Sequence, residues 1–399
     1  MVRKKLLHKS WIAGCLVILL LTGVIGVASA KSDDIAETND LRIEGQAAIL
    51  IEPISGEVLF QKNADQKLPP ASVTKLMVML LTLEALDQGK IKLTEIITAS
   101  PEACRMGGSQ IWLEPGEQMT VAELLKAVSI VSANDASYAL GEHLAGSEEN
   151  FIALMNKRAK ELGLKNTVYV NTTGLDPDSG GAGNITSAAD MARLAREVVK
   201  HPVVFRWTGA WIDSLRDGKS FLRNTNRLVR FYRGCDGLKT GFTAKAGYCL
   251  VATAQRDGVR LISVVMNSPT ADTRSKDISK MFNHGFSKFK SVRIFQGGET
   301  VGAVKVFRGQ QTTVAAVVPR EFAAVLKREA QGNIVKTVQL DRLVQAPVRK
   351  GQTIGKVRVS VDGKNCGEIE LVAGAEINRA SIFQIWWRIF QQTIRAGVN

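Results

Sequence analysis

The feature that most constrains this fold is a lysine at the head of an apolar run. The letters SVTK at residues 72–75 are followed by LMVML at residues 76–80. The pattern predicts a helix over 72–86, and residues three apart on a helix share one face, so Ser72 and Lys75 are neighbours. An isolated buried charge is costly. Lys75 therefore either reaches solvent or loses its proton through burial and serves Ser72 as a base.

Two further motifs follow Ser-x-x-Lys in the chain. Ser132-Ala133-Asn134 lies in a loop between two helical patterns, and Lys239-Thr240-Gly241 lies on a predicted strand. Each motif alone is unremarkable: Ser-x-x-Lys recurs at residues 287–290, where it is most simply a solvated stretch. In this order and context, however, the three are the ordered triplet of penicillin-binding proteins and serine β-lactamases.

The predicted elements form one mixed α/β (α+β) domain over residues 40–290. Strand patterns at 46–52 and 57–60 flank a turn, and a capping-box pattern opens a helix at Thr120. The pattern predicts further helices at 72–86, 135–145, 149–162, 187–200 and 272–288, and strands at 233–241, 247–254 and 259–266. We expect a mainly antiparallel sheet flanked by helices, with strands from both ends of the domain.

The chain changes character after about residue 290. Short alternating runs, with a hairpin turn at Asp362-Gly363, predict a small β-rich domain over 291–377. Residues 378–399 then form an amphipathic, Trp-rich and basic segment that is too short and interrupted to span a bilayer. The pattern favours a helix in the interface of a membrane surface. An ordinary amphipathic helix packed on the protein is the alternative.

The first 30 residues are typical of a secretory signal peptide, with a basic start, an apolar core and Ala28-Ser29-Ala30. An uncleaved anchor helix is the alternative. Removing residues 1–30 removes four cations and no acids, so the formal charge falls from +14 to +10. We expect an extracytoplasmic protein on the outer face of the cytoplasmic membrane, attracted to anionic lipids or wall polymers, and no nucleic-acid partner.

The cysteines and histidines indicate neither a disulfide framework nor a metal site. Cys235 and Cys249 flank a predicted hairpin symmetrically about position 242, so they could be bonded, although two buried free thiols are the favoured interpretation. The scattered histidines support neither a metal site nor a Ser-His-Asp triad. We expect no cofactor.

The chain resembles the low-molecular-mass penicillin-binding proteins, specifically the D-alanyl-D-alanine carboxypeptidases of the peptidase S11 type. Besides the triplet, residues 236–248 (DGLKTGFTAKAGY) are similar to the family's extended Lys-Thr-Gly segment. Residues 173–176 and 186–191 are similar to its middle segment. The β-rich tail and terminal amphipathic segment match its architecture. The chain departs from many relatives at Ala133, where glycine is frequent, and at Phe242, where some have a polar residue.

The resemblance implies a serine-type carboxypeptidase that trims peptidoglycan stem peptides ending in D-Ala-D-Ala and is acylated by β-lactam antibiotics. Ser72 would be the nucleophile, Lys75 would accept its proton, and Ser132 would relay a proton to the leaving D-alanine. The substrate would be bound by five residues: Asn134, which would also orient Lys75, and Lys239, Thr240, Gly241 and Phe242. The backbone N–H groups of Ser72 and Phe242 would form the oxyanion hole.

Other functions use the same residues. A non-catalytic β-lactam or cell-wall sensor would acylate without turnover, and a β-lactamase or D,D-endopeptidase would use the same site on another substrate. A β-lactamase has no need of a β-rich tail and anchor, and the intact triplet argues against the sensor. The sequence alone identifies no group that activates the deacylating water.

Overall fold

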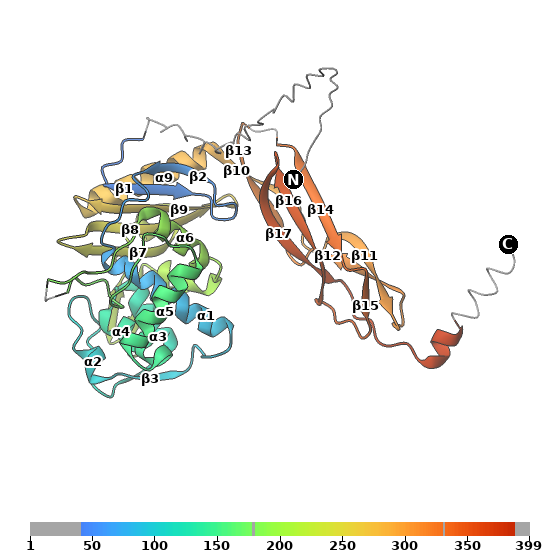
Figure 1. Cartoon of the computed structure of the whole chain (residues 1–399), viewed down its shortest axis with the longest axis horizontal. Coiled ribbons are helices and arrows are strands. Elements are labelled where there is room, and N and C mark those ends of the chain that lie inside the picture. Colours follow the sequence, from blue (N-terminus) through green and yellow to red (C-terminus); the bar gives the residue numbers. More distant parts are fainter. Residues whose placement is uncertain (1–40, 178–179, 330–331, 388–399) are drawn as a thin grey trace, which may run out of the picture. The chain divides into compact units, whose positions relative to one another are not determined.

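The computed structural model describes residues 41–177, 180–329 and 332–387 (Figure 1). The predicted signal peptide at 1–30 lies outside these residues, as do residues 388–399 of the predicted anchor. Their predictions therefore stay predictions, and so do the exact domain boundaries at 290 and 377.

The mixed domain is built around one five-stranded antiparallel sheet, in the order β2-β1-β9-β8-β7. β1 (Ala47–Ile51) and β2 (Val58–Lys62) come from the start of the domain. β7 (Cys235–Thr243), β8 (Gly247–Arg256) and β9 (Val259–Ser268) come from its end. The predicted antiparallel sheet with strands from both ends is confirmed.

Helices cover both faces of this sheet, because successive residues of its strands point to opposite faces. In β1, Ile49 joins the core that contains α1 (Lys75–Asp87) and α6 (Ala188–Val198), whereas Leu50 joins the core beneath α9 (Ala271–Lys288). Figure 1 shows α9 over one face of the sheet and α1, α3 (Val121–Ile130), α4 (Asn134–Ala145), α5 (Glu148–Glu161) and α6 on the opposite side.

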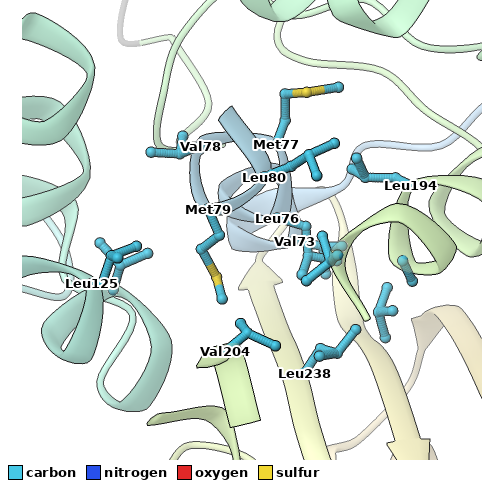
Figure 2. Close-up of a cluster of buried hydrophobic side chains, with 14 of the residues drawn as sticks. Val73, Leu76, Met77, Val78, Met79, Leu80, Leu125, Leu194, Val204 and Leu238 are labelled. Atoms are coloured by element: carbon cyan, nitrogen blue, oxygen red, sulfur yellow. The ribbon is translucent and has the colours of Figure 1, made fainter. Parts of the chain in front are cut away.

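The head of α1 differs from the prediction in one respect. Residues 71–74 form a 3-10 turn, η1 (Ala71–Thr74), and the α-helix begins only at Lys75. The five residues after Lys75 are completely buried, and Figure 2 shows them within a cluster of apolar side chains from several elements. A helix that is apolar on all sides must lie inside the domain, so the site starts from the core and not from a surface loop.

The remaining elements of this domain surround α1 or frame its loops. They are β3 (Ile96–Thr98), α2 (Pro101–Cys104), β4 (Gln118–Thr120), α3 (Val121–Ile130), α4 (Asn134–Ala145), α5 (Glu148–Glu161), η2 (Pro202–Val204), α7 (Phe205–Thr208), β5 (Ile212–Leu215), β6 (Ser220–Arg223) and α8 (Leu228–Phe231). The predicted capping box at Thr120 is present, with reciprocal bonds to Glu123. The two small two-stranded sheets, β3–β4 and β5–β6, and the short helices α2, α7 and α8 were not predicted.

The β-rich domain has its own apolar core. A six-stranded sheet has the order β14-β16-β17-β12-β11-β15, beside a two-stranded β10–β13 pair. The strands are β10 (Phe289–Phe295), β11 (Thr300–Phe307), β12 (Thr313–Val317), β13 (Phe322–Lys327), β14 (Ile334–Leu340), β15 (Leu343–Gln345), β16 (Thr353–Val361) and β17 (Lys364–Ala373). Asp362 and Gly363 join β16 to β17 with positive φ angles of 50° and 78°, as the predicted hairpin turn requires.

The hairpin that carries Cys235 and Cys249 is centred differently from the prediction. β7 and β8 pair through Thr243 and Gly247, and Cys249 lies opposite Gly241. The two cysteines therefore do not face each other, and both are buried free thiols. The turn lies further along because Thr243 Oγ1 accepts a bond from the backbone N–H of Ala246 and closes it there.

Within the described residues, no helix is both long and apolar enough to cross a membrane. Residues 382–387 are helical.

Candidate active site

Ser72 and Lys75 lie in direct contact where η1 passes into α1. The distance from Lys75 Nζ to Ser72 Oγ is 2.9 Å, and Lys75 Nζ also donates to the carbonyl oxygen of Thr173 at 2.9 Å. Ser72 is partly exposed, whereas Lys75 is completely buried. The hydroxyl can therefore meet a ligand while the amine behind it is shielded from water.

Burial changes the proton affinity of this amine. The apolar surroundings lower the pKa of Lys75 well below its usual value, and the nearby charge of Lys239 lowers it further; Asp135 acts weakly in the opposite direction. A neutral amine can accept a proton, whereas an ammonium cannot. Of the two alternatives for Lys75, burial therefore favours an amine that can lose its proton over a charge that reaches solvent.

The loop that contains Gly174 packs closely against η1. Gly174 has φ of +80°, and a Cβ there would lie 1.8 Å from the carbonyl oxygen of Ala71. Only glycine fits this approach. The contact fixes the carbonyl of Thr173 against Lys75 and orients the amine toward Ser72.

β7 passes just as closely beside Ser72. A Cβ on Gly241 would lie 2.7 Å from the carbonyl oxygen of Pro70 and 3.1 Å from the backbone nitrogen of Ser72. Gly241 therefore lets the edge strand of the sheet approach the nucleophile. Phe242 follows it, with 54% of its surface exposed, and stacks on Tyr248 with ring centroids 4.3 Å apart.

Lys239 and Thr240 place positive charge and a hydroxyl on the same strand. Lys239 is buried and donates to the carbonyl oxygen of Thr240 at 2.9 Å. Burial, and to a smaller extent the charge of Arg274, lower the pKa of Lys239 to about 7. Thr240 Oγ1 donates to Thr225 Oγ1 at 2.7 Å. This end of the site suits a single carboxylate.

The Ser132-Ala133-Asn134 motif supplies buried polar atoms that have no protein partner within the described residues. Ser132 Oγ and Asn134 Oδ1 are both of this kind, and so is Arg274 Nε. Ser132 has φ of +65°, an uncommon conformation for a serine. Buried polar atoms are normally paired, so these atoms point to a polar ligand.

Asn134 is held differently from the prediction. Its Nδ2 donates to the carbonyl oxygen of Gly107, and a Cβ on Gly108 would lie 2.8 Å from that nitrogen. No hydrogen bond joins Asn134 to Lys75 in the part of the chain that the structure describes. The protein groups that hydrogen-bond to Lys75 Nζ are Ser72 Oγ and the carbonyl oxygen of Thr173.

Three residues of this site were missed by sequence reasoning: Thr173, Thr225 and Arg274. Thr173 follows Lys75 by 98 residues, so no local pattern links the two. Thr225 connects β7 to the loop of Ser132, because its backbone N–H donates to the carbonyl of Ile130 at the end of α3. In the described ranges no cluster of three or more histidine, cysteine or acidic side chains could hold a metal ion.

Comparison with known proteins decides the family. The profile of peptidase S11, described as D-alanyl-D-alanine carboxypeptidase, matches residues 33–270, more than half of the chain. The chain belongs to the peptidase S11 family. A second profile, the C-terminal domain of penicillin-binding protein 5, matches residues 289–379. The resemblance inferred from the three motifs is confirmed, as is the α+β domain followed by a β-rich one.

Relatives cover nearly the whole of this S11 protein. D-alanyl-D-alanine carboxypeptidase DacF of Bacillus subtilis (strain 168) is 41% identical over 91% of this chain and 95% of its own length. The structure of penicillin-binding protein 5 from Haemophilus influenzae has a TM-score of 0.63 and 32% identity, covering 85% of this chain and 98% of the other. Penicillin-binding protein D2 from Listeria monocytogenes, solved in its ampicillin-bound form, has a TM-score of 0.57 and 35% identity, covering 62% and 99%. The S11 protein is thus a serine-type D-alanyl-D-alanine carboxypeptidase of the penicillin-binding group.

Proposed function

We propose that this S11 protein removes the terminal D-alanine of peptidoglycan stem peptides through an acyl-enzyme on Ser72. The observation that carries the proposal is the 2.9 Å contact between Ser72 Oγ and a completely buried Lys75. Lys75 takes the hydroxyl proton as Oγ attacks the carbonyl carbon between the two D-alanines. The negative oxygen that forms is bound by the backbone N–H groups of Ser72 and Phe242.

The terminal carboxylate of the substrate binds at Lys239 and Thr240. Protonated Lys239 supplies the charge, and the Thr240 hydroxyl supplies a hydrogen bond after turning from Thr225. Arg274 adds a second positive charge at this end, and its Nε has no partner among the described residues. A site with two cations selects peptides that end in a free carboxylate, which distinguishes a carboxypeptidase from an endopeptidase.

The leaving group departs as the carbon–nitrogen bond of the tetrahedral intermediate breaks. Ser132 Oγ, buried and unpaired in the described structure, relays a proton to the nitrogen of the departing D-alanine and is reprotonated by Lys75, which thereby returns to its neutral form. Asn134 Oδ1 accepts the amide N–H of the remaining acyl part. Water then attacks the ester carbonyl and restores the Ser72 hydroxyl, with the shortened peptide as product.

We also propose that the protein acts at the outer face of the cytoplasmic membrane. In the described part of the terminal segment, Ile382, Phe383 and Trp386 are 87%, 72% and 58% exposed. Exposed apolar and aromatic side chains of this density are typical of an interfacial helix. Together with the signal-peptide pattern of residues 1–30, this supports anchoring through residues 378–399.

The experiment for the nucleophile is intact-protein mass spectrometry after incubation with ampicillin. We expect a covalent adduct of one ampicillin, located on the peptide that contains Ser72 and absent in Ser72→Ala. An adduct on another residue would contradict the proposal. The lifetime of the adduct separates the alternatives: loss within seconds would indicate a β-lactamase, whereas an adduct that persists together with no release of D-alanine would indicate a sensor.

A further inference from the structure

A second groove of the catalytic domain, about 460 Å³ in volume, lies between α8 and α9. We define the α8–α9 groove by three cations, Arg227, Lys276 and Lys280, one exposed carboxylate, Asp272, and two apolar residues, Leu228 and Phe231. Hydroxyls from Ser275 and Ser279 also line it. Grooves of this size accommodate ligands of a few ring units.

The cations of the groove are only loosely engaged. Arg227 pairs with Asp272 at 3.2 Å, with 61% and 75% of the two side chains exposed. Lys276 is exposed and has no ion-pair partner among the described residues. Lys280 lies 3.6 Å from Asp277 and donates to the carbonyl oxygen of Arg42. Exposed ion pairs are weak and exchange readily, so a ligand with several negative charges can compete for these groups.

The wall of the groove that α8 forms is basic. Residues 227–233 contain three cations (Arg227, Arg230 and Arg233) and no acid, and Arg227 lines the groove directly. Phe231 is 65% exposed, and the guanidinium of Arg230 lies 5.7 Å from its ring and 5.9 Å from the ring of Trp211. Exposed cations alone could serve only to keep the protein soluble, but an exposed aromatic ring among them is typical of a binding surface.

We infer that the α8–α9 groove binds a chain of the phosphate-linked sugar or polyol type, an anionic wall polymer. Lys276 and Lys280 are one helical turn apart on α9, about 5–6 Å between Cβ atoms, and Arg227 lines the other wall, so the groove presents three cations to one ligand. The apolar side chains of Leu228 and Phe231 suit the carbon units between phosphates. A recessed groove fits a chain better than a flat bilayer, which meets protruding side chains first.

The groove is connected to the catalytic strand through the two residues that precede Arg227. Thr225 accepts the hydrogen bond of Thr240, and Asn226 Nδ2 donates to the carbonyl oxygen of Gly237 at 3.0 Å. A polymer held in the groove therefore keeps the wall close to the active site. The inference goes beyond the proposed function and does not depend on turnover, so the Ser72→Ala protein is expected to bind the polymer equally well.

The test is binding of the full chain to a defined poly(glycerol phosphate) oligomer at low salt, measured by calorimetry. We expect the triple variant Arg227→Gln, Lys276→Gln, Lys280→Gln to lose at least about tenfold in affinity, which corresponds to about 1.4 kcal/mol, because three charged contacts to phosphate are removed together. The matched variant Lys157→Gln, Lys160→Gln, Lys165→Gln removes the same charge from α5 and the loop after it, and should lose less than about twofold. Asp272→Asn frees Arg227 and should tighten binding.

Equal losses in the two triple variants would overturn the inference, because overall charge alone would then explain the binding. So would equal binding of an uncharged chitin oligomer. Vesicles with anionic lipid should bind the groove variant as well as the unaltered protein; a loss confined to vesicles would assign the groove to lipid instead. Acylation by ampicillin checks that each variant is folded, and Asp272→Asn, a single exposed substitution, tests the groove even if the triple variant does not fold.

Discussion

In the proposed mechanism, two lysines of the site, Lys75 and Lys239, hold opposite protonation states. Lys75 acts as a base only when neutral, and burial favours that state by lowering its pKa. Lys239 attracts a carboxylate only when charged, yet its pKa is lowered to about 7. Titratable groups with separate tasks in one site are typical of acid–base catalysis.

The pH dependence of kcat/KM follows from Lys239. The amine is charged below about pH 7 and neutral above it, so we expect kcat/KM for a D-Ala-D-Ala peptide to fall as pH rises through this value. The alkaline fall of kcat should occur at a higher pH than that of kcat/KM, because a bound carboxylate raises the pKa of Lys239. In Lys239→Arg the side chain stays charged at every working pH, and the alkaline fall of kcat/KM should disappear. An unchanged profile in that variant would assign the fall to another group.

Gly241 is expected to tolerate no side chain. The Cβ of Gly241→Ala would lie 2.7 Å from the backbone oxygen of Pro70, so β7 or η1 must shift. We expect the rate of acylation by ampicillin to fall at least tenfold, with a loss of about 1–3 kcal/mol in unfolding free energy. Stopped-flow acylation and urea denaturation measure the two effects. Acylation at the original rate would show that β7 does not position Ser72.

The residues of the three motifs could be predicted from the sequence, because each motif is local and its order is informative. The residues that hold them could not. Thr173 contacts Lys75 across 98 positions and Thr225 contacts Thr240 across 15. Such contacts are set by packing of the sheet against the helices, which no local pattern encodes. The same reason explains why the hydrogen bond between Asn134 and Gly107 was not predicted.

At the scale of elements, α3 carries the loop of Ser132 to the site. Its N-terminus is fixed by the capping box of Thr120 and Glu123, and its last residue, Ile130, accepts the backbone bond of Thr225. Long periodic helices and alternating strands were predicted well. Short elements such as α8 and the β5–β6 hairpin were not predicted. A segment of four residues is too short to show whether its apolar residues follow the helical period of 3.6 or the strand period of two.

The cap of α3 gives a stability prediction. Thr120→Ala removes the side chain that accepts from Glu123 N–H, and we expect a loss of about 0.5–2 kcal/mol in unfolding free energy. Urea denaturation followed by circular dichroism measures it. Thr120→Ser, which keeps the hydroxyl, is the control and should lose much less. Equal losses in both variants would point to the lost methyl group and not to the cap.

At the scale of the whole molecule, we propose that catalysis and membrane attachment reside in different parts of the chain. The apolar core of the β-rich domain contains none of the proposed catalytic residues. Removing residues 378–399 should therefore leave kcat/KM on a soluble peptide within about twofold while abolishing sedimentation with anionic vesicles. A truncated protein that still sediments would contradict the proposed anchor.

The central claim is that Ser72 and a neutral Lys75 release D-alanine from a peptide that ends in D-Ala-D-Ala. The most direct measurement is D-alanine release from such a peptide, with Ser72→Ala and Lys75→Arg beside the unaltered protein. We predict sustained turnover in the unaltered protein, none in Ser72→Ala, and a loss of at least about a thousandfold in Lys75→Arg, whose side chain stays charged and cannot accept the proton. No release from a folded protein that still forms the ampicillin adduct, or undiminished release in Lys75→Arg, would contradict the account.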